Sequence, residues 1–477
     1  MTRKNLTAAL LAGFAGTAGM VSVSDAVNVN PDGLGQALIF PYYTTRNDQD
    51  TLISVVNTSD QVKGVKVRVI DGKGSQEVLD FNLYLSPFDV WTARIFDNGT
   101  GGAISTFDQS CTAPNLLSRG AAGEPFRNVL FAGDKIADNS LDRTREGYVE
   151  IISMLDLDEG STFGALAVHG SDGVPANCNA IRGLWQGSGA WTSNSGLQGP
   201  ADPASAPASG LYGTAYVVDM VEGTAFTYSA TALEGWTGTI QHTEPGSTFP
   251  SLAQVNDGPG PLSGQATARV FDAEGQFRSA LFTTRQGDAV SAVFMHDTVM
   301  NDYVVNPDLG AGTDMVFTMP TKRFHVPQNG ATPFAPFTVA LGANGSCEPV
   351  GLQHWDMEEQ TPGGPELDFS PRPPDAPGPC LPWEVTVVEV EGSSAKQTVL
   401  ASGNAVNLPL EFDQGWLRVR FNDSGHVLTS DDGVTFEGLP VIGFAAMRFI
   451  DGDISDGVLA NYTGLFNHKA TRSITSS

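Results

Sequence analysis

Beyond its first residues, the chain alternates apolar and polar positions with a period of two. Residues 65–70 (VKVRVI) alternate apolar with basic side chains, and residues 81–85 (FNLYL) alternate until Ser86 and Pro87. Successive side chains of a strand point to opposite faces of its sheet, so this pattern predicts half-buried strands.

Similar apolar or β-branched segments recur along the chain, and turn-forming residues separate many of them. They lie at residues 51–57, 90–95, 147–152, 215–218, 266–271, 315–319, 383–388, 416–421 and 441–446. Helical periodicity is nearly absent after the N-terminal segment. Short strands at intervals of about ten residues predict an all-β fold, an antiparallel, immunoglobulin-like β-sandwich, present as two domains.

Two segments without strand signals suggest how the chain is divided. Residues 183–210 are rich in Gly, Ser, Ala and Pro, which places an N-terminal sandwich domain at residues 27–200 and a C-terminal one at 201–477. Residues 360–382 contain eight prolines, which predict an extended excursion because proline cannot donate to a β-ladder. The similarity of residues 50–53 to 314–317, and of 146–151 to 414–419, suggests an internal duplication.

The first 26 residues have the pattern of a secretory signal peptide. Arg3 and Lys4 precede an apolar stretch at residues 6–23, and Ser24 and Ala26 are small residues suited to cleavage after Ala26. The alternative is a transmembrane anchor, but the stretch is rich in Gly, Ala, Ser and Thr. No later segment approaches the ~20 apolar residues of a membrane helix. We therefore expect a protein exported to the periplasm or cell surface.

Export changes the interpretation of the four cysteines, because disulfides persist outside the cytoplasm. Four cysteines allow three pairings, and the pairing of sequence neighbours is favoured because it puts one bridge in each half of the chain. The expected bridges are Cys111–Cys178 and Cys347–Cys380, the second tying the proline-rich loop at 347–380. A zinc site is the alternative, but the cysteine spacings do not match zinc motifs.

The charge balance excludes several partners. The chain of 477 residues has 53 acidic and 26 basic side chains, a net charge of −27. Nucleic acids and anionic lipid surfaces both require basic patches, so neither is an expected partner. The hydrophobic fraction of 41% is enough for a core.

No catalytic motif is found in the sequence. It contains no GxSxG elbow, no HExxH and no convincing nucleotide-binding loop, and its seven histidines are dispersed. The best ion-binding candidate is the acidic segment 451–457, in which oxygen ligands suited to calcium come from Asp451, Asp453, Ser455 and Asp456. The alternative is a solvated acidic turn between strands, because the segment does not match an EF-hand loop. No other cofactor is expected.

Two tryptophans form the best sugar-binding candidate. Trp185 and Trp191 lie in a Gly- and Ser-rich segment, and exposed indole rings can stack on the apolar faces of sugars. The alternative is that both rings fold back over the edge of a sandwich.

Residues 38–44 (LIFPYYT), 50–57 (DTLISVVN), 83–91 (LYLSPFDVW) and 317–324 (FTMPTKRF) resemble a family of exported proteobacterial proteins for which no activity is established. The resemblance spans most of the chain and implies export in a Gram-negative bacterium. It implies no catalytic residue.

The sequence therefore predicts an exported, non-catalytic β-protein that acts by surface contact, as an adhesive, matrix or envelope component. Self-association or a surface polysaccharide is the expected kind of partner. The alternative is a carbohydrate-binding or carbohydrate-active exported protein.

Overall fold

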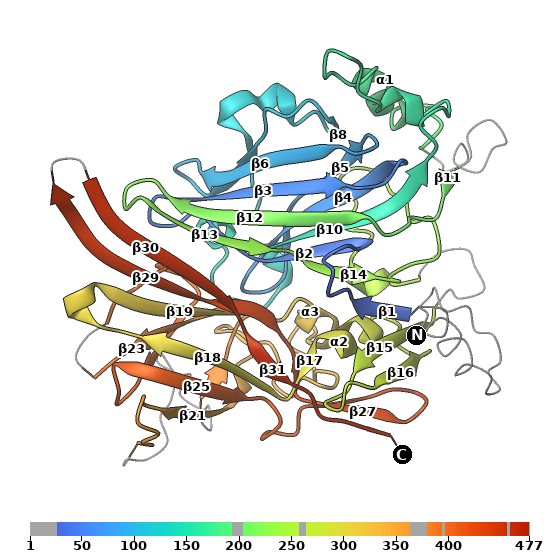
Figure 1. Cartoon of the computed structure of the whole chain (residues 1–477). Helices are drawn as coiled ribbons and strands as arrows, with labels where there is room; N and C mark the ends of the chain where they lie inside the picture. The colour runs from blue at the N-terminus through green and yellow to red at the C-terminus, as the bar shows by residue number, and fades with distance from the viewer. Residues whose placement is uncertain are drawn as a thin grey trace, which may run out of the picture.

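Antiparallel strands dominate the computed structural model of the protein (Figure 1), which confirms the expected all-β sandwich class. The structure describes residues 26–192, 204–256, 264–362, 379–393, 396–455 and 458–476. The predicted leader lies outside the described residues except for Ala26. Most of the proline-rich segment, from residue 363 to 378, also lies outside them.

The first sheet has ten strands. Its order is β16 (Phe277–Phe282), β15 (Ala266–Phe271), β1 (Ala26–Val29), β14 (Thr231–Glu234), β2 (Ala37–Thr44), β10 (Glu146–Leu157), β4 (Val62–Asp71), β5 (Glu77–Leu85) and β8 (Cys111–Ala113), and β11 (Ala204–Ser205) also pairs with β10. The second sheet packs on the central strands of the first. Its order is β13 (Thr224–Ser229), β12 (Leu211–Asp219), β3 (Gln49–Asn57), β6 (Val90–Asp97), β7 (Gly102–Ser105) and β9 (Glu124–Pro125).

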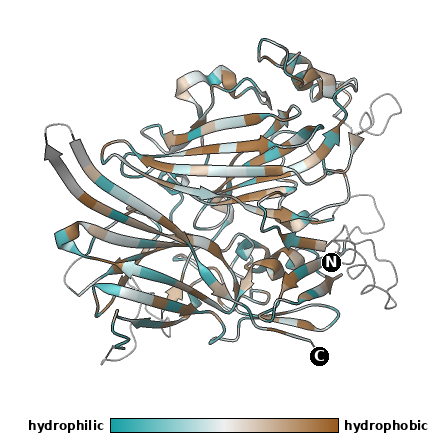
Figure 2. Cartoon of the chain, in the orientation of Figure 1, coloured by the Kyte–Doolittle hydropathy of each residue, from teal (hydrophilic) through white to brown (hydrophobic). Residues whose placement is uncertain are grey.

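A second sandwich lies below the first in Figure 1. One of its sheets has the order β24 (Ala405–Pro409), β23 (Val385–Glu391), β19 (Ala311–Thr318), β29 (Ile442–Ser455) and β30 (Val458–Asn467). The other has the order β21 (Gly351–Trp355), β25 (Gln414–Arg420), β18 (Thr298–Val304) and β31 (Lys469–Thr471). Figure 2 shows hydrophobic stretches along the strands of both sandwiches.

Smaller elements complete the described chain. Short strands pair as β17 (Met295–His296) with β28 (Leu439–Pro440), as β20 (Glu348–Pro349) with β22 (Cys380–Leu381), and as β26 (Val427–Thr429), β27 (Val434–Glu437) and β32 (Ile474–Ser476). The α-helices are α1 (Cys178–Leu184), α2 (Asp288–Phe294) and α3 (Lys322–His325). None of the described helices is long and apolar enough to span a membrane.

The boundary between the two sandwiches lies later in the chain than the predicted domain boundary at residue 200. Strand β12 pairs with β3 over its whole length, and β14 pairs with β2, so both belong to the first sandwich. The second sandwich begins only with β18 at Thr298. The loop-like composition of residues 183–210 marks a long connection within one sandwich, because loop composition does not reveal which strands pair across it.

The two sandwiches share a pattern of six strands. In the first, β10-β4-β5 faces β12-β3-β6, and in the second, β29-β19-β23 faces β31-β18-β25, with the same order along the chain. The structural counterpart of β3 is therefore β18. The similarity of residues 50–53 to 314–317 instead links β3 with β19, so the segments that resemble one another do not occupy equivalent places.

The central strands of the first sheet are buried on both faces. Every residue of β2, β4 and β10 is buried, whereas β3 and β12 alternate buried with exposed or half-buried positions. One face meets the second sheet, where the rings of Phe81 and Trp91 lie 5.7 Å apart. The other face meets the second sandwich, where Thr318 Oγ1 donates to the Pro41 carbonyl at 2.6 Å.

The face toward the second sandwich carries charged side chains in ion pairs. Arg68 contacts Glu77 at 2.8 Å and also Glu150, and Arg143 contacts Asp71 and Asp134 at 2.6 Å each. A buried charge is tolerated only with a partner, so the Arg143–Asp71 pair fixes how the segment before β10 sits at the end of β4.

Candidate functional site

The two candidate tryptophans lie under α1 within an aromatic cluster. Trp191 is 1% exposed, and its ring stacks on Tyr84 at 5.3 Å between centroids. Trp185 is partly buried, contacts Trp191 at 5.3 Å, and donates from Nε1 to the Tyr84 hydroxyl at 2.9 Å. His242 accepts or donates at the same hydroxyl at 3.0 Å. Both rings are thus turned inward over the first sheet, in the arrangement that the sequence offered as the alternative to sugar binding.

Both expected disulfides are confirmed. Cys111 of β8 is bonded to Cys178 at the start of α1, and Cys347 is bonded to Cys380 of β22. The first bridge fastens α1 and the aromatic cluster to the edge of the first sheet. The second closes the base of the proline-rich loop.

The calcium prediction stays untested. Asp451, Asp453 and Ser455 lie on β29, near the end of its hairpin with β30, and their side chains lie outside the described part of the chain, as does Asp456. Among the side chains that are described, no group of three or more His, Cys, Asp or Glu could hold a metal ion.

Among the described residues, two serines contact histidines, but neither pair has the geometry of a nucleophile and its base. Ser291 Oγ lies 2.7 Å from His325 Nε2, and Asp288 Oδ1 lies 3.8 Å from that same nitrogen. A Ser-His-Asp relay requires the acid on the opposite ring nitrogen. Burial also lowers the pKa of His325 to about 3. This pair lies in the core, with Ser291 and His325 fully buried.

The second pair repeats the same geometry nearer the surface. Ser86 Oγ lies 2.7 Å from His169 Nδ1, and Asp89 Oδ2 lies 3.6 Å from that nitrogen. Serine and acid compete for one ring nitrogen, so Asp89 cannot orient the ring toward the serine as a relay requires. These contacts fasten neighbouring loops together.

The second sheet presents a face to solvent, called here the outer face. It consists of those exposed and half-buried residues of β3, β6, β12 and β13 that point away from the first sheet: Asp50, Leu52, Ser54, Val56, Val90, Thr92, Arg94, Tyr212, Thr214, Tyr216, Val218, Ala225, Thr227 and Ser229. Tyr216 is paired with Leu52, and Leu52 with Arg94, so these three side chains form one row across the sheet. Of the fourteen residues, only Asp50 and Arg94 are charged, and they pair at 2.8 Å.

A groove of about 410 Å³ runs into the outer face. Leu52 and Tyr216 line it, at 39% and 43% exposure, together with Phe107, at 72%. Exposed apolar side chains that lie together on a chain with 53 acidic residues make the outer face a candidate contact surface. The sequence predicted strands at residues 51–57 and 215–218. It did not indicate that these strands pair and that their exposed residues therefore share one face.

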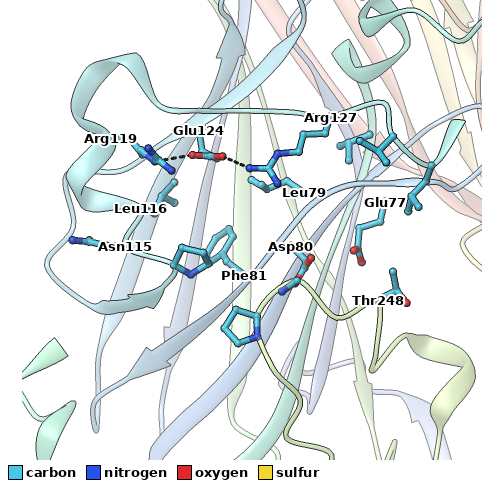
Figure 3. Close-up of a pocket in the computed structure, with 16 residues that line it drawn as sticks. Glu77, Leu79, Asp80, Phe81, Asn115, Leu116, Arg119, Glu124, Arg127 and Thr248 are labelled. Carbon is cyan, nitrogen blue, oxygen red and sulfur yellow. Dashed lines mark hydrogen bonds and ion pairs between the residues drawn. The ribbon is translucent and has the colours of Figure 1, made fainter. Parts of the chain in front are cut away.

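A second cavity lies beside β5, with a volume of about 370 Å³ (Figure 3), and is called here the β5 cavity. Along the cavity β5 has one extra residue opposite β4, because Val69 pairs with Leu79 and Ile70 with Glu77. This bulge brings Glu77 to the same face as Asp80, although strict alternation would put them on opposite faces. No signal in the sequence marks the bulge.

Charged groups line the β5 cavity on two sides. On one side, Glu124 accepts ion pairs from Arg119 at 2.7 Å and from Arg127 at 2.8 Å. On the other, Arg68 contacts Glu77 at 2.8 Å. Burial raises the pKa of Glu77 to about 7, Arg68 opposes this shift, and Asp80 adds to it.

Comparisons with known proteins gave no relative. No family model matches the chain, and neither a curated protein nor a solved structure matches it.

Proposed function

We propose that this protein is an exported β-protein that acts by surface contact, as an adhesive, matrix or envelope component, and that the outer face is its contact surface. The observation that carries the proposal is the lack of uncompensated charge on that face. A molecule with a net charge of −27 repels its own kind, and repulsion is weakest where two neutral surfaces meet.

The first expected occupant of the outer face is a second copy of the chain. β3 and β12 have nine residues each, so the face is about 30 Å long, and four strands make it about 19 Å wide. The resulting area of roughly 600 Å² is somewhat below the ~800 Å² per partner of a standard interface. This size supports weak, salt-dependent association of two copies rather than a permanent dimer.

Sheet edges are less suited to this contact. The edge strand β16 is covered by a neighbouring loop, in which Asp431 N–H donates to the Leu281 carbonyl at 2.9 Å. The edges of β13 and β30 meet each other, because Thr463 Oγ1 donates to the Ala225 carbonyl at 2.6 Å. Such covering is a common protection against edge pairing, so contact through a face is favoured over contact through these edges.

Sedimentation velocity of the chain from Val27 onward, over a NaCl series, tests the proposal. We expect association to strengthen as salt screens the net charge. The double variant Leu52→Glu/Tyr216→Glu should stay monomeric, because it adds charge to the apolar row. Leu309→Glu is the matched control, since Leu309 is 56% exposed in the other sandwich, and it should associate like the unmodified protein.

A chain that is monomeric at every salt concentration would refute the self-association, as would a double variant that still associates.

The alternative function is carbohydrate binding, and the exposed rings of Tyr212 and Tyr216 on the same face support it. Co-sedimentation with insoluble cellulose or chitin distinguishes the two. A monomer that is retained by polysaccharide, and released by the double substitution, would favour the carbohydrate function.

A further inference from the structure

The β5 cavity is enclosed by three segments that are hydrogen-bonded to one another. Strand β5 forms its floor, and residues 114–130 and 245–248 contribute its walls. The Arg127 N–H donates to the Val78 carbonyl at 2.9 Å, and the Gly246 N–H donates to a carboxylate of β5 at 2.7 Å. These bonds fasten both walls to the floor, so the cavity is already formed before any ligand enters, as is usual for small-molecule sites.

Apolar side chains form the floor and the mouth of the cavity. Leu79, Phe81 and Leu116 line it, and Val129 and Leu130, which also line it, are 77% and 37% exposed. The volume of about 370 Å³ falls at the lower end of the ~300–1,000 Å³ of small-ligand sites. Exposed apolar side chains around a concave surface are typical of a site that a ligand covers.

Each carboxyl on the floor of the cavity has a compensating partner. Asp80 contacts Lys66 at 3.4 Å, and Glu77 contacts Arg68 at 2.8 Å. Glu77 is also hydrogen-bonded to Asp80, and burial raises the pKa of Glu77 to about 7, so this group keeps its proton in mildly acidic solution. The floor therefore contributes no net charge that a ligand would have to balance.

The wall above the floor has an excess of one positive charge. Arg119 and Arg127 share the single carboxylate of Glu124, at 2.7 Å and 2.8 Å. Their side chains are 52% and 65% exposed, and each guanidinium has five N–H donors, so donors remain for a second anion. Figure 3 shows Leu79 and Leu116 beside this row of three side chains, so an anion held by the arginines would have apolar surface next to it.

We propose that the β5 cavity binds an apolar molecule with a single carboxylate, of the size of a medium-chain fatty acid, whose carboxylate lies at Arg119 and Arg127. The apolar part of the ligand lies on the floor and under the mouth. One negative charge matches the excess of one positive charge, and a guanidinium fork suits a carboxylate. A polyamine meets no free carboxyl, and a neutral sugar uses neither the excess charge nor the apolar floor. The inference is independent of the outer face, which lies on the other sheet of the sandwich.

Isothermal titration calorimetry with octanoate and with 1-octanol tests the proposal on the chain from Val27 onward. The titrations are made at pH 6, where octanoate is ionised and Glu77 is protonated. We expect saturable binding of octanoate, and binding about tenfold weaker for 1-octanol, because the alcohol has the same chain without the charge-assisted contact.

Two variants separate the charged wall from the apolar mouth. Arg119→Gln/Glu124→Gln/Arg127→Gln removes the excess charge and leaves no carboxylate unpaired. It should bind octanoate no more tightly than 1-octanol, and its binding of 1-octanol should be unchanged, which also shows that the cavity is intact. Val129→Ser/Leu130→Ser should weaken the binding of both ligands about tenfold, because less apolar surface is buried.

Arg94→Gln is the matched control, because Arg94 is also a partly exposed arginine in an ion pair, but on the outer face. It should bind both ligands like the unmodified protein. The proposal is overturned if octanoate gives no saturable heat at millimolar concentration, or if 1-octanol binds as tightly as octanoate. It is also overturned if the triple variant still prefers octanoate, or if the serine variant binds both ligands as before.

Discussion

Asp314 provides a quantitative test of how a buried carboxyl limits the stability of the second sandwich. It lies on β19, fully buried, and its Oδ2 accepts the backbone N–H groups of Val399 at 3.0 Å and Leu400 at 2.7 Å. Its Oδ1 is buried with no hydrogen-bond partner among the described residues. Burial raises the pKa of Asp314 to about 7, the Leu400 N–H opposes the shift, and Glu389 adds to it. We expect Asp314→Asn to stabilise the protein, because the amide keeps an acceptor oxygen and cannot ionise.

The magnitude follows from the pKa difference between the folded and unfolded chains. The unfolded chain releases the Asp314 proton near pH 3.8, whereas the folded chain keeps it until about pH 7. The unfolded state therefore binds fewer protons between these values, and stability is lost as pH rises through this window. Roughly three pH units at 1.36 kcal/mol each give about 4 kcal/mol. The advantage of Asp314→Asn should grow from near pH 4 and level off above pH 7.

Urea unfolding of both proteins, at intervals from pH 4.5 to 8, measures this difference in the free energy of unfolding. Effects of other titrating groups cancel, because both proteins share them. Asp314→Ala is the comparison variant. Its free energy of unfolding should depend on pH in the same way as that of Asp314→Asn. At every pH it should be lower than that of Asp314→Asn by about 1–3 kcal/mol, because two buried N–H groups lose their acceptor. The reasoning is refuted if the free energy of unfolding of Asp314→Asn differs from that of the unmodified protein by the same amount at every pH.

Three further predictions concern the covalent and aromatic framework. Replacing Cys111 and Cys178 with serine should lower the free energy of unfolding by about 4 kcal/mol, since the bridge closes a separation of 67 residues; an unchanged urea midpoint would contradict this. Trp191→Ala should cost about 3–5 kcal/mol and reduce the near-ultraviolet circular dichroism of the aromatic cluster; normal stability with an unchanged spectrum would show that the ring is not a packing element. N-terminal sequencing of exported protein should begin at Val27, and recovery of intact Met1 from a membrane pellet would contradict cleavage.

The sequence determined the class of fold and the cross-links. Period-two alternation predicts strands because it follows from the geometry of a single strand, and residues 81–85, 215–218 and 266–271 lie in β5, β12 and β15. The disulfides were predictable because only three pairings exist for four cysteines, and sequence neighbours met in space.

The burial of β4 shows where this reasoning stopped. Alternating valines with Lys66 and Arg68 predicted a strand with one face in water, yet every residue of β4 is buried. The second sandwich and neighbouring loops cover that face, and Arg68 is neutralised by Glu77 and Glu150 from adjacent strands. A local pattern indicates which side chains share a face, but not whether a distant segment covers it.

Both surface features were decided by tertiary structure alone. The outer face depends on the pairing of β3 with β12, which are more than 150 residues apart, and the position of Glu77 beside the β5 cavity depends on one extra residue opposite β4. Register and long-range pairing are set by the packing of complete sheets, which no local pattern in the chain records. Glu77 and Asp80 are ordinary acids among the 53 acidic residues of the sequence until the bulge turns them to the same face.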